Sequence, residues 1–446
     1  MEKLTRLIEK YNTSGPRYTS YPPVPFWQST PTEEVWIKQI RNQYQKEKCL
    51  DLYVHIPYCE SLCYYCGCSR VINKSHDQED DFVNVLLKEW SLYKEKLGFT
   101  PKINSLHFGG GTPTYLSAKN LERIINELSQ ERNTDFIGSI EIDPRTCNEE
   151  HLKVLSDTKI TRVSFGIQDF DPKVQQAINR NQSVKLVTEL VNKIRAYQFN
   201  SLNFDLIYGL PKQTEQSIQN TIETVAELSP DLIAFYSYAH LPDKIKNQRL
   251  IKNEDLPTPQ QKLHFYQIGK SLLKRHHFYD IGLDHFAKED NFLYQAKKEE
   301  RLHRNFMGYV DKKSPILIGL GPTSISDSSM SFIQNQKEIK DYKAAISQNK
   351  LPIEKGHVHS EKDLSIQKII LEIMCKKEAT FKTQDLPYWE EILKELKSFE
   401  EDEILALRTD GLKVTEQGHT FIRNIAMVFD FYLREQKGRT KFSQTV

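Results

Sequence analysis

The stretch LDLYVHIPYCESLCYYCGC (residues 50–68) joins an apolar run to a cluster of thiols. Its first eight residues, LDLYVHIP, are apolar and β-branched in the way that predicts a buried strand. Four of the chain's seven cysteines follow within ten residues, in the spacing C-x3-C-x2-C-x-C. In barrel-like α/β folds, chemistry gathers in the loops that follow the carboxyl ends of the strands. This stretch therefore predicts both the type of fold and its reactive edge.

Five further apolar runs alternate with helical patterns along the chain. They are INSLHFGG (103–110), IGSIEID (137–143), ITRVSFGIQ (160–168), NSLNFDLIYG (200–209) and PDLIAFYSYAH (230–240). In residues 82–97 the apolar side chains recur at three- or four-residue steps, and Ser117 is placed to cap a second helix. Strands that alternate with helices imply parallel pairing through right-handed crossovers. We therefore expect an α/β fold, an open and partial (βα)6 TIM-like barrel.

Three other segments flank this predicted barrel. Residues 1–35 contain GPRYTSYPPVPFW, rich in proline and aromatic residues, and predict an ordered arm rather than a helix. Residues 36–350 would form the catalytic domain, in which FYDIGLDHF and PILIGLGPTSIS add two strand-like runs beyond the barrel. After the expected linker LPIEKGHVHS, residues 360–446 predict a smaller, mainly helical, winged-helix-like domain that packs on the core.

The composition excludes several classes of protein. The 61 basic and 60 acidic residues nearly cancel, so no overall charge favours nucleic acid or an anionic membrane. The mean hydropathy is −0.58 and no apolar run approaches 18 residues, which argues against a membrane-spanning helix. The amino-terminal MEKLTRLIEKYN lacks the continuous apolar region of a secretory signal. With cysteines that are clustered and odd in number, a reducing cytoplasm is the expected location.

Three chemistries could use the cysteine cluster. A disulfide is unfavourable because neighbouring cysteines in a short loop rarely satisfy bridge geometry. Zinc usually takes two separated pairs of ligands, and the chain has no second pair at that spacing. An iron–sulfur cluster prefers thiolates from one tight loop. We expect Cys59, Cys63 and Cys66 to bind three irons of a 4Fe-4S cluster, with Cys68 too close to Cys66 to reach the fourth.

An iron without a protein ligand implies a bound reactant, and the C-x3-C-x2-C spacing resembles that of the radical S-adenosylmethionine superfamily. In those enzymes the amino acid end of S-adenosylmethionine chelates the open iron, and an aromatic residue, here Tyr65, lies beside the adenine. GGGTPTYL (109–116) resembles the superfamily's glycine motif, where glycine lets the backbone approach a ligand closely. Glu141, Gln168 and Asp205 each stand late in an apolar strand, where a polar side chain needs a partner.

Motifs along nearly the whole chain are similar to those of the oxygen-independent coproporphyrinogen III oxidase family, dehydrogenases of haem synthesis. They include SGPRYTSYP (14–22), LHFGGGTPTYL (106–116), IEIDPR (140–145), GIQDF (166–170), NRNQ (179–182), FDLIYGLPKQT (204–214), YAHLP (238–242), GLDHFA (282–287), LHRNFMGY (302–309) and RNIAMVFDFYLR (423–434). A haem chaperone of the same superfamily shares the cysteine and glycine motifs but lacks the GPRYTSYP arm and the HRNF-x-GY stretch. Both are present here.

The resemblance implies a set of site residues. A first S-adenosylmethionine would be held by Tyr53, Gly110, Thr112, Glu141, Gln168, Arg180 and Asp205. A second would be lined by Gly111, Ala239 and Ile325, helped by Tyr65 and Cys68. Cys68, Tyr65 and Glu141 are the candidates for catalytic roles. The implied reaction uses a 5′-deoxyadenosyl radical to decarboxylate two propionates of coproporphyrinogen III, which gives the two vinyl groups of protoporphyrinogen IX.

The implied partners are the porphyrinogen substrate and an external electron donor and acceptor, with no nucleic acid, no membrane and a monomeric chain. Because the substrate carries four carboxylates on an apolar macrocycle, it should require aromatic and cationic side chains. We expect Arg17, Tyr18 and Tyr21 of the arm, with His303 and Arg304, to help close and line its cavity. Two alternatives stay open: the haem chaperone of the superfamily, and a zinc-stabilised binding module without catalysis.

Overall fold

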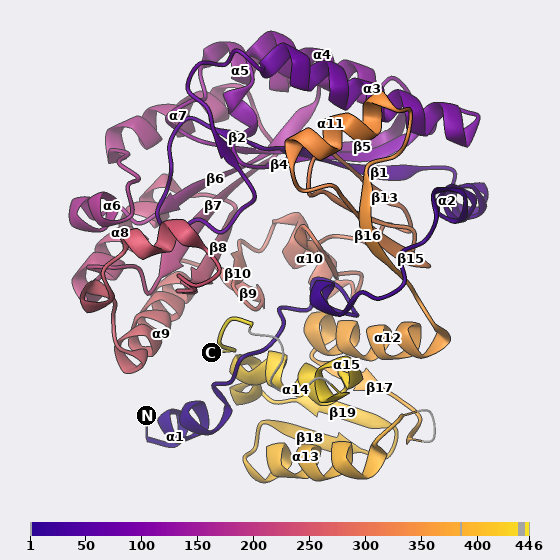
Figure 1. Ribbon diagram of the computed structural model, residues 1–446. Coiled ribbons are helices and arrows are strands. Elements are labelled where there is room, and N and C mark those ends of the chain that lie inside the picture. Colours follow the sequence, from indigo (N-terminus) through magenta and orange to yellow (C-terminus); the bar gives the residue numbers. More distant parts are fainter. Residues whose placement is uncertain (1, 384–385, 436–441, 446) are drawn as a thin grey trace.

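A computed structural model describes residues 2–383, 386–435 and 442–445 (Figure 1). Those parts of the arm and of the C-terminal prediction that fall on residues 1, 384–385, 436–441 and 446 lie outside the described residues. The centre of the molecule is a twelve-stranded open sheet in the order β16-β15-β14-β13-β1-β4-β5-β6-β7-β8-β10-β9.

Six parallel strands form the middle of this sheet and confirm the expected partial (βα)6 barrel. They are β1 (Leu50–Ile56), β4 (Ile103–Gly110), β5 (Arg132–Ile142), β6 (Ile160–Gln168), β7 (Ser201–Tyr208) and β8 (Leu232–Ser237). Each pairs in parallel with the next one along the chain. The carboxyl ends of all six strands therefore lie at one edge of the sheet, where the cysteine loop begins.

Helices connect these strands and cover the outer face of the sheet (Figure 1). They are α3 (Glu79–Leu97), α4 (Ala118–Leu128), α5 (Glu149–Asp157), α6 (Pro172–Ala177), α7 (Val184–Ala196), α8 (Glu215–Leu228) and α9 (Pro259–Arg275), with α2 (Glu33–Glu47) preceding β1. Ser117 caps α4 as expected, because its side chain accepts a hydrogen bond from the backbone N–H of Asn120. The periodic stretch at 82–97 lies within α3, which confirms that helix too.

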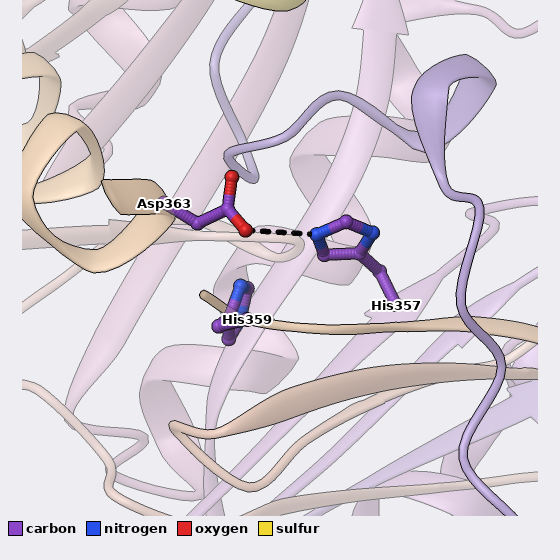
Figure 2. A group of neighbouring side chains, drawn as sticks. All are labelled: His357, His359 and Asp363. Atoms are coloured by element: carbon purple, nitrogen blue, oxygen red, sulfur yellow. Dashed lines mark hydrogen bonds and ion pairs between the residues drawn. The ribbon is translucent and has the colours of Figure 1, made fainter. Parts of the chain in front are cut away.

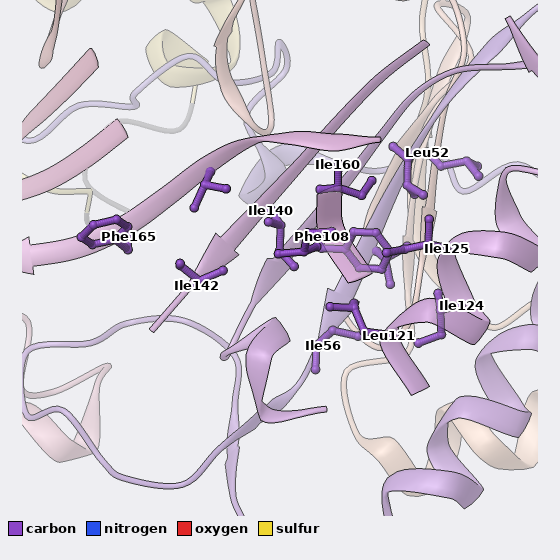
Figure 3. Close-up of a cluster of buried hydrophobic side chains, with 14 of the residues drawn as sticks. Leu52, Ile56, Phe108, Leu121, Ile124, Ile125, Ile140, Ile142, Ile160 and Phe165 are labelled. Carbon is purple, nitrogen blue, oxygen red and sulfur yellow. The ribbon is translucent and has the colours of Figure 1, made fainter. Parts of the chain in front are cut away.

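The main hydrophobic core lies between the sheet and these helices. Figure 3 shows Phe108 and Ile140 of the sheet facing Leu121, Ile124 and Ile125 of α4, and all five side chains are fully buried. The apolar face of α4 thus packs against the strands that the apolar runs of the sequence predict. Truncating one such aliphatic side chain to alanine typically costs about 2–5 kcal/mol of stability, so this core fixes the position of the strand ends.

Both edges of the sheet extend beyond the barrel. On one side β13 (Leu317–Leu320) pairs in parallel with β1, and β14 (Ile325–Asp327), β15 (Ser331–Asn335) and β16 (Ile353–Val358) follow in antiparallel pairing. On the other side, antiparallel β10 (His285–Ala287) and β9 (Tyr279–Gly282) follow β8. Helix α10 (Phe292–Lys298) and the hairpin of β11 (His303–Asn305) and β12 (Gly308–Val310) follow β10 in the chain, whereas α11 (Ile339–Ser347) joins β15 to β16 and packs against α3.

The expected linker, residues 351–360, is instead mostly the edge strand β16. Its backbone pairs with β15 from Ile353 to Val358. Gly356 permits this pairing, since a Cβ there would lie 2.3 Å from the Phe332 carbonyl oxygen. The prediction of a linker was wrong because Gly and two His interrupt the apolar alternation by which the other strands were found.

The arm prediction is also wrong for its first residues. Residues Glu2–Tyr11 form helix α1, in which Leu7 is fully buried and Tyr11 stacks on Phe399 at 4.6 Å between ring centroids. The helix forms because this apolar face packs against the C-terminal segment, a contact that local sequence does not reveal. The proline-rich part that follows is extended, apart from a short turn at Val24–Phe26, and Gly15 N–H donates to the carbonyl of Ser443.

The C-terminal segment is mainly helical, with one small antiparallel sheet. Its elements are α12 (Glu361–Lys376), β17 (Glu378–Thr380), α13 (Trp389–Glu401), β18 (Leu405–Arg408), β19 (Gly411–Val414), α14 (Ile422–Val428) and α15 (Phe431–Glu435). The strands pair in the order β17-β19-β18. A second hydrophobic cluster joins this segment to the arm and to β12, and the segment lies beside α1 below the sheet (Figure 1).

Candidate active site

The cysteine loop leaves the carboxyl end of β1 as expected. It begins at the short strand β2 (Tyr58–Cys59), which pairs with β3 (Val71–Ile72) at the other end of the loop. A cavity of 670 Å³ opens where the loop meets the carboxyl ends of the six central strands. Twelve of the predicted site residues line it: Cys59, Cys63, Tyr65, Cys66, Cys68, Gly110, Gly111, Thr112, Glu141, Gln168, Arg180 and Asp205.

Three predicted residues lie elsewhere. Tyr53, on β1, does not line this cavity. A Cβ on Gly109 would lie 3.2 Å from the Tyr53 ring and 3.3 Å from the carboxyl carbon of Glu141, so Tyr53 is next to a residue of the cavity wall. Ala239 lines a second cavity of 320 Å³. Ile325 begins β14, beside Gly319 of β13. The residues expected around a second S-adenosylmethionine are therefore divided between two cavities and a neighbouring strand.

Donors and cations around the thiols stabilise negatively charged sulfur, although burial raises the pKa of Cys59 to about 11. The Thr112 hydroxyl donates a hydrogen bond to Cys59 Sγ at 3.3 Å. Arg180 Nη1 and Arg145 Nη2 lie 3.7 and 3.9 Å from Cys63 Sγ. A hydrogen bond from Cys68 lowers the pKa of Cys66 to about 6. Because donors and cations stabilise thiolates, which are the form that binds iron, these residues fit a three-cysteine iron–sulfur site.

Two acids, Asp143 and Asp205, and two arginines, Arg145 and Arg180, also line the cavity. The Asp143 carboxylate accepts hydrogen bonds from Nε and Nη2 of Arg145, at 2.9 and 2.6 Å, and from Nη1 of Arg180 at 3.1 Å. Burial alone raises the pKa of Asp143, but Arg180 and Arg145 outweigh it and hold that pKa well below its usual range. Deeper in the barrel, burial and the nearby Glu141 raise the pKa of Asp205 to about 7.

Asp143 and Arg145 are site residues that the sequence reasoning missed. Both lie in IEIDPR, which was singled out only for its resemblance to the family. Their signal was present, because a charged pair stands directly after the end of β5, at the same edge as the cysteine loop. Arg145 and Arg180 each contact both the Asp143 carboxylate and the Cys63 thiol, and so connect the end of β5 to the cysteine loop.

A side chain far along the sequence holds the cysteine loop in place. Asn247 Nδ2 lies 3.2, 2.8 and 3.0 Å from the carbonyl oxygens of Cys63, Tyr64 and Cys66. The neighbouring Gln248 Nε2 donates to the carbonyls of Tyr65 and Ala239, at 2.9 and 3.1 Å. No local pattern marks these residues, because their role comes from a contact across more than 180 positions.

We predict that Asn247→Ala loosens the cysteine loop and weakens retention of iron by about 10–100-fold, as for other residues that orient metal ligands. The substitution removes the side-chain amide that hydrogen-bonds three backbone carbonyls of the loop, while every thiol remains. The measurement is iron per chain during titration with a chelator under anaerobic conditions. Asn220→Ala, on the exposed face of α8, is the control; equal retention in both variants would contradict this role.

Gly110, at the end of β4, lines the cavity. Its φ is +109°, and a Cβ there would meet both the His55 ring and the Ile56 carbonyl at 2.8 Å. By contrast, Gly98 at the end of α3 also has a positive φ, +80°, but a Cβ there would have 4.0 Å to its nearest neighbour, Arg41 Nη2. Comparing substitutions at these two glycines therefore distinguishes the effect of backbone strain from the effect of crowding at the site.

We predict that Gly98→Ala lowers the free energy of unfolding by about 1–2 kcal/mol through backbone strain alone. Gly110→Ala should lower it by about 1–3 kcal/mol more, because the added methyl group is crowded. Urea titration of the two variants, prepared anaerobically, measures the difference. Equal losses of unfolding free energy in the two variants would contradict the prediction, because they would mean that the added methyl group at Gly110 is not crowded.

The arm residues do not line the main cavity. Arg17 forms an ion pair with Asp284 and lines the second cavity, with its guanidinium 5.6 Å from the Tyr236 ring centroid. Tyr18 and Tyr21 are buried in the second hydrophobic cluster. The Tyr18 hydroxyl donates to Asp430 at 3.0 Å.

The two residues of the HRNF stretch lie against the arm. Arg304 Nε donates to the carbonyl of Arg17 at 3.2 Å, and its guanidinium lies 4.7 Å from the Tyr309 ring centroid. His303 and Arg304 line a small cavity together with Tyr18 and Tyr21. The described contacts of these residues are therefore with the protein itself rather than with the 670 Å³ cavity.

The described helices include none that is both long enough and apolar enough to cross a bilayer.

The open parallel sheet and the thiol-lined cavity at its reactive edge define a radical S-adenosylmethionine protein. Consistent with this, the radical SAM superfamily pattern matches residues 53–225. The chain is 38% identical to the oxygen-independent coproporphyrinogen III oxidase of Helicobacter pylori strain J99 and 37% identical to that of Escherichia coli K12, each alignment covering at least 98% of both chains. The chain belongs to the oxygen-independent coproporphyrinogen III oxidase family.

A solved structure supports the same assignment. The coproporphyrinogen III oxidase of Escherichia coli, described as a radical SAM enzyme, superimposes with a TM-score of 0.89 and 35% sequence identity. The match covers 96% of this chain and 99% of that one. It therefore includes the arm and the C-terminal segment as well as the barrel.

Proposed function

We infer that the protein oxidatively decarboxylates two propionate side chains of coproporphyrinogen III to vinyl groups, giving protoporphyrinogen IX in haem synthesis. The observation that carries this inference is the full-length similarity to oxidases of that name, combined with a cavity lined by all four clustered cysteines. The protein is an oxidoreductase that uses a 4Fe-4S cluster and S-adenosylmethionine. When bound, these cofactors supply the one-electron chemistry that removes a hydrogen from the propionate.

Cys59, Cys63 and Cys66 would hold the cluster, and Cys68 would remain unligated at the cavity wall. The donors around the first three support this division, as does the hydrogen bond by which Cys68 stabilises the Cys66 thiolate. The chain's contribution is to keep the thiols in one orientation, through Asn247, and to place a cation next to the cluster, through Arg180.

The cavity offers a binding site for a nucleotide that is also an amino acid. We propose that S-adenosylmethionine is held by the set Tyr53, Gly110, Thr112, Glu141, Gln168, Arg180 and Asp205. A backbone that approaches closely at Gly110, a cation at Arg180 and carboxylates at Glu141 and Asp205 match the carboxylate, amino and ribose hydroxyl groups of that ligand. The same side chains exclude water from the reacting atoms, which is the protein's main task in cofactor chemistry.

We further propose a second S-adenosylmethionine site around Gly111, Ala239 and Ile325, with Tyr65 and Cys68. What supports it is the position of Gln248, whose amide donates to the carbonyls of both Tyr65 and Ala239 and so connects the two cavities. Cys68 and Tyr65 then stand between the two sites, where they and Glu141 are the proposed catalytic residues.

The substrate would approach from the side of the arm. Arg17 lies beside Tyr236, which lines the main cavity, so the arm could close over a bound porphyrinogen. We propose residues 1–35 as this arm, 36–350 as the catalytic domain and 360–446 as the C-terminal domain. We also propose a monomer that works in the cytoplasm with an external electron donor and acceptor and without nucleic acid. All seven cysteines are free, as a reducing location requires.

The test is an anaerobic reaction with dithionite, S-adenosylmethionine and coproporphyrinogen III. The proposal predicts two molecules of carbon dioxide and two vinyl groups per substrate, measured by mass spectrometry of the porphyrin product. Tight haem binding without carbon dioxide release would contradict the proposal and favour the haem chaperone. A colourless protein that contains zinc in the cysteine loop would favour the binding module.

A further inference from the structure

A second group of metal-binding side chains lies far from the cysteine loop, where β16 turns into α12. His357 is near the end of β16, His359 follows it, and Asp363 is in the first turn of α12. Figure 2 shows the three side chains converging, with Asp363 above His359 and facing His357. One ligand atom from each residue lies within 4.8 Å of those of the other two, and all three side chains are buried.

The two imidazoles have unmet hydrogen-bonding capacity. Both ring nitrogens of His359 and Nδ1 of His357 are buried and have no hydrogen-bond partner among the described residues. Each buried polar atom left without a partner costs about 1–3 kcal/mol, so native structures rarely keep three together. His359 is only 7% exposed, and its ring packs edge-on against Phe332 at 4.6 Å between centroids. A bound ligand that accepts nitrogen lone pairs would remove this penalty.

The third side chain supplies a buried carboxylate, which hydrogen bonds hold in place but which has little positive charge beside it. The Asp363 side chain is only 1% exposed, so its carboxylate lies away from solvent. Among the described residues His357 is its one ion-pair partner, at 3.2 Å from Nε2 to Oδ2. A buried anion beside imidazoles is the setting that a divalent cation neutralises.

The hydrogen bonds of Asp363 decide which atoms remain free for a cation. Oδ2 accepts from Ser360 N–H and from its hydroxyl, both at 2.8 Å, as well as from His357. Oδ1 accepts from the Tyr432 hydroxyl at 2.9 Å and keeps one lone pair.

We propose that His357, His359 and Asp363 form a structural site for one zinc ion. Imidazole nitrogen and carboxylate oxygen are zinc ligands at about 2.0–2.2 Å, which places them about 3.3–3.6 Å apart in a tetrahedral site. The side chains would close from their present separation by small rotations, and a water would take the fourth position. The ion would fasten the edge strand β16 to α12 and, through Tyr432, to α15. This site is independent of the proposed activity.

The first test uses the intact iron-loaded protein, equilibrated with zinc chloride and then dialysed anaerobically. The proposal predicts one zinc per chain by elemental analysis. X-ray absorption at the zinc edge should show nitrogen and oxygen ligands near 2.0–2.1 Å and no sulfur near 2.3 Å. Absence of zinc, or a sulfur shell that places the ion in the cysteine loop, would overturn the proposal. This measurement needs no variant and therefore decides even if substitutions destabilise the fold.

The second test compares His359→Phe with a control, His277→Asn. His277 is exposed and precedes β9, at the opposite edge of the sheet from β16. His359→Phe should lose the zinc, reducing it at least tenfold, while iron per chain stays unchanged. The control should keep both metals. Zinc should also raise the unfolding temperature of the wild type and of the control but not that of His359→Phe, because an ion stabilises only the state that binds it. Equal zinc content in the two variants would overturn the assignment.

Discussion

Replacing Cys59, Cys63 or Cys66 by serine abolishes cluster binding and with it decarboxylation. Each substitution removes one of the three thiolates that the cavity presents together, and the hydroxyl that replaces it is a poor ligand for iron. The loss should exceed the roughly 10–100-fold seen when only an outer-shell partner of a metal ligand is removed. The measurements are iron and sulfide per chain after anaerobic reconstitution, followed by turnover of coproporphyrinogen III.

Two further cysteine variants make this prediction specific. Cys68→Ser should keep the cluster and lose turnover, because Cys68 lines the cavity but is assigned no iron. Cys49→Ser, outside the site, should keep both. Iron loss in Cys68→Ser comparable with that in Cys59→Ser would mean that four thiols enclose the cluster, leaving no iron for S-adenosylmethionine.

Asp143→Asn should lower the free energy of unfolding by about 3–5 kcal/mol, because it leaves two partly buried guanidinium groups without a counter-charge. Arg180 is as buried as Asp143, with 8% of each side chain exposed. The variant should also weaken cluster binding, since Arg145 and Arg180 reach Cys63 from their positions on Asp143. Urea titration at pH 7 gives the first quantity and iron content the second.

The pH dependence of this variant has a definite sign. The pKa of Asp143 is lowered on folding, so its stabilising effect is complete above its unfolded pKa of about 4 and is lost as the pH falls further. The difference in stability between wild type and Asp143→Asn should therefore be largest at neutral pH and shrink below about pH 4. Glu289→Gln, which removes an exposed ion pair with Lys298, is the control and should leave stability nearly unchanged. A similar loss in both variants would refute a special role for Asp143.

The sequence was sufficient for the barrel and for most of the cavity. Each of the six central strands contains a run rich in apolar residues, and some end in polar or glycine residues of the site, as at Gly110 and Gln168. In a parallel sheet, strand ends meet at one edge, so residues separated by more than a hundred positions could be placed together. The cysteine spacing then indicated the metal and its unfilled position.

The remaining features depend on contacts that no local pattern encodes. Helix α1 and strand β16 form because distant elements cover or pair with them, and α1 would be marginal in isolation at ten residues. Asn247 supports the cysteine loop through its amide alone, which sequence does not distinguish from any other loop asparagine. The sequence does not reveal the group of His357, His359 and Asp363 for the same reason, because it predicts a linker for residues 351–360.

Electron paramagnetic resonance of the dithionite-reduced protein, with and without S-adenosylmethionine, tests most directly whether three thiols leave one iron open. We expect about four irons per chain, a cluster signal, and a change in that signal when S-adenosylmethionine is added, in the wild type and in Cys68→Ser. A protein without iron, or a cluster signal that S-adenosylmethionine leaves unaltered, would contradict this expectation.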